Sequence, residues 1–156
     1  MTEVPYEQSL ADAEAACFRA LCTATGFTPG RNAYLGVNPG NPDCLVFDAG
    51  AAQSAALNAF SSPVAHFRAQ ADFYSRDRAA LQRLVMRIRR LLPTNEESDP
   101  LSIRENSCVL QFRLALESGN PSALKTAEIQ TARDATPIPT WTTSAVFDLV
   151  FLTPTD

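Results

Sequence analysis

The hydrophobic pattern is most regular in the middle of the chain, from Val64 to Tyr74. Apolar residues there take every second position, and polar residues take the positions between them. A period of two places successive side chains on opposite faces of an extended strand. The segment is therefore predicted to be a strand with one buried face and one face in water. Its main apolar positions are Phe67, Ala69, Ala71 and Phe73.

The period changes at Ser75, where apolar residues begin to recur at three- and four-residue steps. This spacing predicts an amphipathic helix that turns one apolar stripe toward a core. Ser75 or Asp77 is the expected N-cap, and Pro93 is the expected stop. The apolar stripe consists of Leu81, Leu84, Val85, Ile88, Leu91 and Leu92.

The N-terminal part of the chain predicts a helix followed by two short strands. Helical spacing runs from about Tyr6 to Ala24, and Gly26 is the expected C-terminal cap. Two apolar runs, 32–37 and 44–48, then flank a cluster of Pro, Gly and Asn, which predicts a hairpin with a longer loop. Residues 49–63 are expected to form a loop or a short helix.

The C-terminal half predicts two long strands separated by polar segments. Residues 94–106 are expected to form an acidic surface loop, and residues 120–140 a proline-containing arm or a loose hairpin. The first strand begins at Ser107 and the second runs from about Trp141 to Leu152. The apolar face of the first strand is Cys108, Leu110, Phe112, Leu114 and Leu116; that of the second is Thr143, Ala145, Phe147, Leu149 and Phe151.

These elements predict an α+β fold. We expect a mostly antiparallel sheet of four to five strands with the two amphipathic helices packed on one face. The chain has 156 residues, 46% of them hydrophobic and 19% charged, which suits one globular domain spanning residues 1–156.

The sequence also indicates the cellular compartment in which the protein is expected. The first residues are acidic rather than basic and no apolar stretch follows them, so no secretory signal is expected. No apolar run approaches the ~18 residues that a membrane span requires, so no membrane partner is expected. The four cysteines form no C-x-x-C pair, which favours reduced and buried thiols in a cytoplasmic protein.

Familiar catalytic and ligand-binding motifs are missing from the sequence. His66 is the only histidine, so a histidine-based triad or relay would have to use it, and it falls on the wet face of its strand. No glycine-rich phosphate-binding loop occurs, and Cys17 and Cys22 lack the spacing of a zinc site. We therefore expect no catalytic residues, no cofactor and no metal. A hidden acid site built from Asp43, Asp48 and Asp72 stays open as an alternative.

Arginine is concentrated in the second helix. The chain holds twelve Arg and one Lys, and six of the arginines lie between positions 76 and 90. Arg76, Arg83, Arg87 and Arg90 step by seven, four and three, which puts them on one stripe away from the leucines. The stripe is either a solvated outer face or an interface for acidic groups on a neighbouring subunit, with DNA as a further alternative. Together with Trp141, these four arginines are the predicted subunit interface.

Three features of the chain carry a resemblance to a known family. An N-terminal helix leads into a Tyr34-Leu35-Gly36 strand, a Pro39/Pro42 turn and the strand Cys44–Asp48. A strand then passes directly into an amphipathic helix over Ala65–Leu92, and Trp141-x5-Phe147-x3-Phe151 lies near the C-terminus. In this order the chain resembles the tail terminator (tail completion) and head–tail joining proteins of long-tailed bacteriophages.

The resemblance implies a structural virion protein rather than an enzyme. Such proteins form a ring, usually hexameric, that caps the tail tube and offers its other face to the head-side connector or completion protein. The implied partners are sister subunits and the major tail tube protein, in a neck assembled in the host cytoplasm. DNA would pass through the channel without specific binding, which suits a net charge of −4.

Other functions remain as alternatives. One is a different neck or head–tail connector subunit. The others are a small enzyme with an acidic site and an adaptor module that docks an acidic partner through its arginine helix.

Overall fold

The computed structural model describes residues 6–48, 64–92, 101–105, 108–116 and 118–152. Two helices and seven strands occur in these ranges. In chain order they are α1 (Tyr6–Thr25), β1 (Ala33–Leu35), β2 (Cys44–Asp48), β3 (Val64–Ser75), α2 (Arg78–Leu91), β4 (Leu101–Glu105), β5 (Cys108–Leu114), β6 (Lys125–Ile129) and β7 (Ile138–Leu152).

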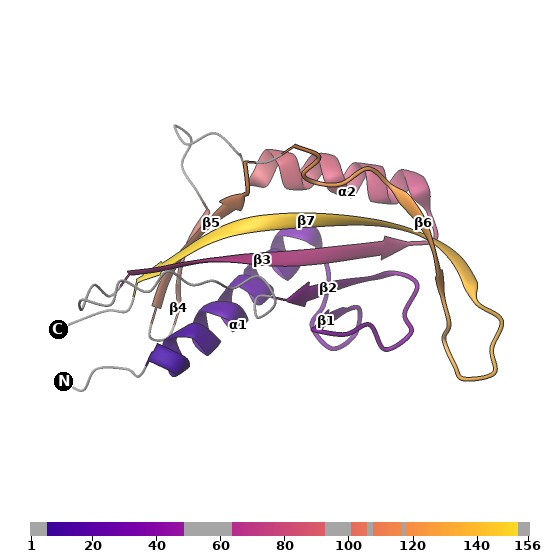
Figure 1. The fold of residues 1–156 in the computed structure, drawn as a ribbon, viewed down its shortest axis with the longest axis horizontal. Coiled ribbons are helices and arrows are strands. Elements are labelled where there is room, and N and C mark those ends of the chain that lie inside the picture. Colours follow the sequence, from indigo (N-terminus) through magenta and orange to yellow (C-terminus); the bar gives the residue numbers. More distant parts are fainter. Residues whose placement is uncertain (1–5, 49–63, 93–100, 106–107, 117, 153–156) are drawn as a thin grey trace.

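One open sheet contains all of these strands. Its order is β1-β2-β3-β7-β5-β4, with β6 paired to β7 beyond the end of β5. The central pair, β3 and β7, is antiparallel over twelve positions, from Val64 opposite Leu152 to Ser75 opposite Trp141 (Figure 1). All other pairs except β1–β2 are also antiparallel, which confirms the predicted α+β class. The described strands exceed the predicted four to five because β4 lies in the segment predicted as an acidic loop, and β6 in the segment predicted as a proline-containing arm or loose hairpin.

Both helices cover the same face of the sheet. Alternate residues of the central strands point to this face, and small side chains stand opposite large ones, as Ala69 does opposite Phe147. A single buried cluster joins these residues to the apolar stripes of α1 and α2. The cluster includes Cys17, Leu21, Phe47, Phe73, Leu81, Ile88 and Leu149. The core of the described chain therefore lies between the two helices and this face of the sheet.

The ends of α1 and α2 follow the predicted capping. Gly26 takes a positive φ of 84°, and the N–H groups of Gly26 and Phe27 both donate to the carbonyl of Cys22, which closes α1. Asp77 is the N-cap of α2, because its carboxylate accepts the N–H groups of Ala79 and Ala80. One stripe position differs from the prediction: Leu91 lies on the flank of the last turn and is 40% exposed.

The predicted hairpin between the first two strands is wrong. β1 and β2 are parallel, with Ala33 opposite Leu45 and Leu35 opposite Phe47. The intervening loop doubles back because the side-chain oxygen of Asn38 accepts the N–H groups of Gly40 and Asn41. Residues 36–43 thus return the chain to the start of β1 before β2 begins.

The first long C-terminal strand ends earlier than predicted. β5 stops at Leu114, and Leu116 is 70% exposed. The side chain of Asn120 takes the place of a further strand residue. Its amide donates to the carbonyls of Ala115 and Val146, and its oxygen accepts the N–H of Val146. The side chain of Asn120 thus forms hydrogen bonds with the backbone of Val146 in β7, beyond the point where β5 ends.

Within residues 120–140, the structure contains a hairpin. β6 pairs with the start of β7, from Lys125 opposite Thr142 to Ile129 opposite Ile138, and the hairpin projects beyond the end of β3 (Figure 1). The amide of Gln130 donates to two carbonyls within the turn. In the predicted acidic loop 94–106, residues 101–105 form β4, while 94–100 lie outside the described residues, as do 49–63.

Candidate functional site

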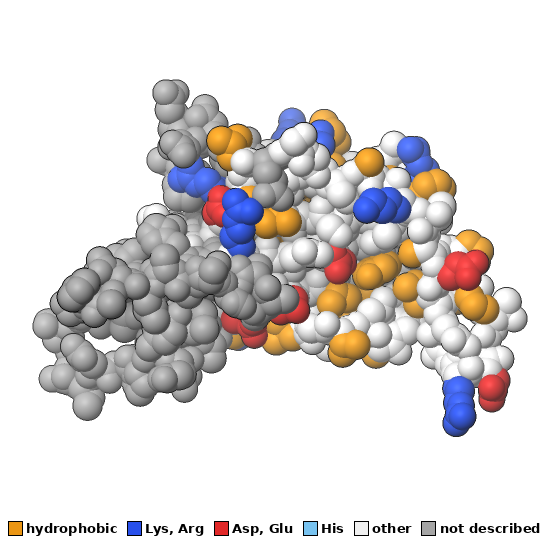
Figure 2. All heavy atoms as spheres, in the orientation of Figure 1, with side chains coloured by type: hydrophobic (Ala, Val, Ile, Leu, Met, Phe, Trp, Pro, Cys, Tyr) orange, Lys and Arg blue, Asp and Glu red, His pale blue; other side chains and the backbone are white. Residues whose placement is uncertain are grey.

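The outer face of α2 carries an exposed methionine among arginines. Met86 is 58% exposed. It lies along a shallow hollow of about 470 Å³, and the side chains of Arg83, Arg87 and Arg90 line the same hollow. These positions face away from Leu81, Val85 and Ile88, which are buried. Figure 2 shows basic side chains along the edge of the molecule that α2 forms.

A second hollow, of about 270 Å³, lies beside the first. It is bounded by α2, the end of α1 and the adjoining ends of β2 and β3. Phe27, Leu81 and Leu84 give it an apolar part, and Arg83 and Arg87 line it together with the outer hollow. The two arginines therefore lie between the exposed Met86 and a second hollow that is lined by both apolar and polar side chains, Asp43 among the polar ones. We call this combined area the arginine face: Arg83, Met86, Arg87, Arg90 and the adjoining hollow.

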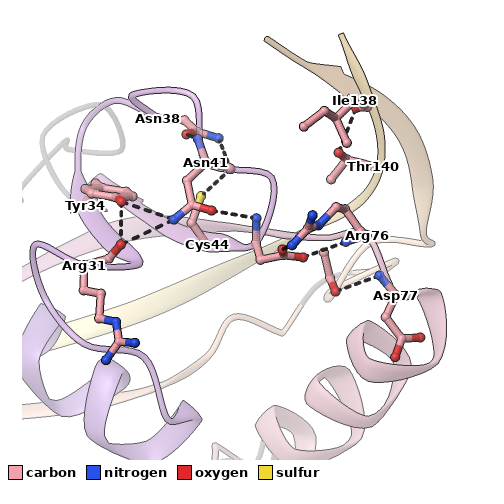
Figure 3. A network of polar contacts seen from close by, with 11 residues as sticks. Arg31, Tyr34, Asn38, Asn41, Cys44, Arg76, Asp77, Ile138 and Thr140 are labelled. Carbon is pink, nitrogen blue, oxygen red and sulfur yellow. Dashed lines mark hydrogen bonds and ion pairs between the residues drawn. The ribbon is translucent and has the colours of Figure 1, made fainter. Parts of the chain in front are cut away.

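Arg76 does not share this face, contrary to the prediction. It lies in the turn before the N-cap, so helical spacing does not reach it. Its guanidinium binds the carboxylate of Asp43, with Nη2 at 2.6 Å and Nε at 2.7 Å from Oδ2, and its backbone N–H donates to Oδ1 (Figure 3). The charge of Arg76 is thus compensated within the chain.

Trp141 contacts its own chain. The ring is partly buried and packs against the core cluster. The guanidinium of Arg78 lies over it, 5.3 Å from the ring centroid, which is cation–π geometry. A role of Trp141 between subunits stays a prediction.

The candidate acids do not converge. Asp43 and Asp48 lie at opposite ends of β2, roughly 16 Å apart at the rise of a strand. Asp43 is held by Arg76, whereas Asp72 accepts hydrogen bonds from Gln70 and Ser144 across the outer face of the sheet. In the described residues, no group of three or more His, Cys, Asp or Glu side chains is placed to hold a metal.

His66 lies in β3 opposite Val150 of β7. Its side chain lies outside the described residues, so the prediction that it faces water stays a prediction.

Three thiols are buried and free. Burial raises the pKa of Cys22 to about 11 and that of Cys44 to about 12, where nearby Asp43 adds to the effect. The pKa of Cys17 is raised well above its usual value, mainly by burial and then by Glu14 and Cys22. A protonated thiol is a weak nucleophile, so these cysteines are poorly suited to covalent catalysis. The prediction that the thiols are buried is confirmed for these three.

Sequence reasoning found the arginines but missed the methionine and the hollow. Met86 was recognisable, because it is three residues after Arg83 and four before Arg90, on the polar side of the helix. The hollow was not, since its walls come from segments far apart in the sequence.

No protein-family model and no curated protein sequence matches the chain. Among the described helices, none combines the length and the apolar character required to cross a lipid bilayer.

Proposed function

We propose that this protein is a structural ring subunit of a bacteriophage virion, similar to a tail terminator, that caps the tail tube and joins it to the head-side connector. The observation that carries the proposal is the arginine face. Met and Arg are enriched in protein–protein interfaces, and an exposed Met86 among arginines loses its contact with water when another subunit covers it. The surface is thus suited to a macromolecular partner.

The order of elements also supports the proposal. The resemblance rests on a helix, a strand–turn–strand unit and a strand that runs directly into an amphipathic helix. α1, β1, β2, β3 and α2 follow one another in that order, with two residues between β3 and α2.

A ring requires two different surfaces on each subunit, because each copy contacts a neighbour on either side. The arginine face supplies one such surface. The β6–β7 hairpin, which projects from the body, is a second element available for contact (Figure 1). A lasting interface buries roughly 1,200–2,000 Å² in total. A net charge of −4 also favours a channel wall that repels DNA phosphates.

The alternative of an acid-based enzyme gains no support from the described residues. Asp43 and Asp48 are separated by the length of β2, and Asp43 and Asp72 are each engaged by neighbours. A general acid and a general base would have to reach one substrate together.

The proposal is tested by the molar mass of the purified full chain and by its binding to tail tubes. We expect light scattering to show a ring-sized oligomer, either alone or once tail-tube subunits are added. We expect sedimentation with tubes to saturate at a small number of copies per tube end. A protein that remains a monomer and never sediments with tubes contradicts the proposal.

A further inference from the structure

Helix α2 is strongly basic, although the chain as a whole is acidic. Its 14 residues include five arginines and neither aspartate nor glutamate, whereas the net charge of the chain is −4. Arg83 and Arg87 are four residues apart, and Arg87 and Arg90 are three apart. Like charges at these spacings on a helix repel each other and destabilise it. An acidic partner bound along this side of α2 would remove the repulsion.

The outer hollow of α2, of about 470 Å³, gathers these charges around an exposed methionine. Arg83, Arg87 and Arg90 line it together with Met86, which is 58% exposed. Within the ranges that the structure describes, the three arginines form no ion pair, and no acidic side chain lines the hollow. The outer hollow therefore offers three positive charges and one apolar surface to a partner.

The order of these side chains along α2 determines which groups fit them. A helix rises about 1.5 Å per residue, so Arg83 and Arg90 are separated by roughly 10 Å along its axis, with Met86 between them. In an extended peptide, alternate side chains point to the same side. Two acids placed two positions before and two positions after an apolar residue are roughly 13 Å apart, within reach of flexible arginine side chains. An acid–apolar–acid pattern thus matches the arginine–methionine–arginine order of the helix.

A partner with this pattern is not offered by the described part of the chain itself. Outside residues 76–90, the described side chains carry seven acidic and six basic groups. Asp43 and Asp148 are bound to arginines, and Asp72 accepts hydrogen bonds from two neighbours. A nucleic acid also fits less well, because a phosphate backbone has no apolar group to cover Met86. These observations favour a segment of a different protein.

We infer that the outer hollow of α2 is a docking site for an extended acidic segment of a different protein, with one apolar residue between its acids. The carboxylates pair with Arg83, Arg87 and Arg90, since a guanidinium binds a carboxylate through two parallel hydrogen bonds. The apolar side chain covers Met86, whose flexible thioether adapts to differently shaped neighbours. This inference rests on the proposed function, because it gives the chemistry of a protein that the ring subunit meets. The adjoining hollow of the arginine face is left for contact between copies.

The first experiment measures binding of a fluorescein-labelled peptide, Ser-Glu-Glu-Leu-Glu-Glu-Ser, to the full chain by fluorescence anisotropy. One comparison peptide has serine in place of leucine, and another has glutamine in place of every glutamate. We expect the parent peptide to bind, the serine peptide to bind about fivefold more weakly, and the glutamine peptide not to bind. Equal binding of the parent and serine peptides, or no binding of the parent, would overturn the inference.

Two variants with the same change of charge locate the site. Arg87→Glu reverses an arginine of the outer hollow, whereas Arg89→Glu reverses an exposed arginine of the same helix that lies outside both hollows. We expect Arg87→Glu to weaken binding of the parent peptide about tenfold, and Arg89→Glu to weaken it less than about threefold. Equal weakening would indicate general attraction to a basic helix and contradict a site at the hollow. Circular dichroism of each variant checks that it is folded.

Met86→Gln tests the apolar contact by a double-mutant cycle. We expect this variant to bind the parent and serine peptides equally, because the leucine has lost its partner. Met86→Leu is the control, and it should keep the difference between the two peptides. A fivefold difference that persists in Met86→Gln would place the leucine elsewhere and refute the docking mode.

The remaining outcomes separate the occupant from the function. A short DNA duplex that binds more tightly than the parent peptide, and is lost in Arg87→Glu, would assign the hollow to nucleic acid. Self-association in light scattering that Arg87→Glu abolishes and Arg89→Glu keeps would assign it to a second copy. Either result overturns the inference. A chain that binds the peptide but never joins tail tubes refutes the ring function and leaves the docking site standing, whereas a chain that caps tubes but binds no peptide refutes only the docking site.

Discussion

Asp43 joins two parts of the chain that lie 33 positions apart. Its carboxylate accepts the guanidinium and the backbone N–H of Arg76, which fixes the start of β2 to the turn before α2. The loop before it is built in the same way, since Asn41 accepts the N–H of Asp43 and donates to Tyr34 (Figure 3). At the residue scale, Asp43, which the sequence suggested as part of a hidden acid site, is therefore bound to Arg76.

We predict that Asp43→Ala lowers the free energy of unfolding by about 1 kcal/mol, because it removes two hydrogen bonds and an ion pair to Arg76 at a partly exposed site. Asp43→Asn keeps an oxygen for the backbone N–H of Arg76 and should cost less. Urea denaturation of both variants measures the difference. Equal losses, or none, would show that the backbone hydrogen bond does not stabilise this turn.

The buried thiols predict a loss of stability at high pH. The pKa of Cys22 is raised by burial from 9.0 to about 11, so below pH 9 both the folded and the unfolded chain keep this proton. Between about pH 9 and 11 only the unfolded state releases it, which favours unfolding as pH rises. We expect the urea midpoint to fall over this range, and to fall less steeply in Cys22→Ala. A slope that is unchanged in the variant would contradict the assignment.

At the scale of elements, the spacing of apolar residues correctly predicted the strand β3 and the helix α2. The period of two at β3 and the helical spacing of α2 follow from faces that each element buries by itself. β6 gave no such signal, because three of its five residues are exposed and it is held by pairing with β7. The parallel pairing of β1 and β2 was not predicted. It depends on side-chain hydrogen bonds within the loop 36–43, and the apolar pattern of the two strands does not indicate them.

That loop also approaches the β6–β7 hairpin, and Gly40 lies at the contact. A Cβ at Gly40 would lie 2.8 Å from the carbonyl oxygen of Gln130, and its φ is +110°. We predict that Gly40→Ala lowers the free energy of unfolding by at least about 2 kcal/mol. Gly36→Ala is the matched control, because its φ is also positive but nothing lies within 4 Å, and it should cost only about 1 kcal/mol. Similar losses in thermal or urea denaturation would show that the contact is not tight.

At the scale of the whole molecule, the candidate site was partly predictable. Helical spacing grouped Arg83, Arg87 and Arg90 correctly, because they all lie within α2. It included Arg76 wrongly, because the helix begins two residues later. The hollow beside them required the tertiary fold, since the end of α1, the residue before β2 and the end of β3 each contribute to its wall.

Electron microscopy of tail tubes incubated with the purified chain tests the central claim most directly. The account predicts a ring of this protein on one end of each tube, and bare tube ends when Arg83 and Arg87 are both replaced by Glu. Tubes whose ends stay bare with the wild-type chain, or that carry the protein along their length, would contradict it.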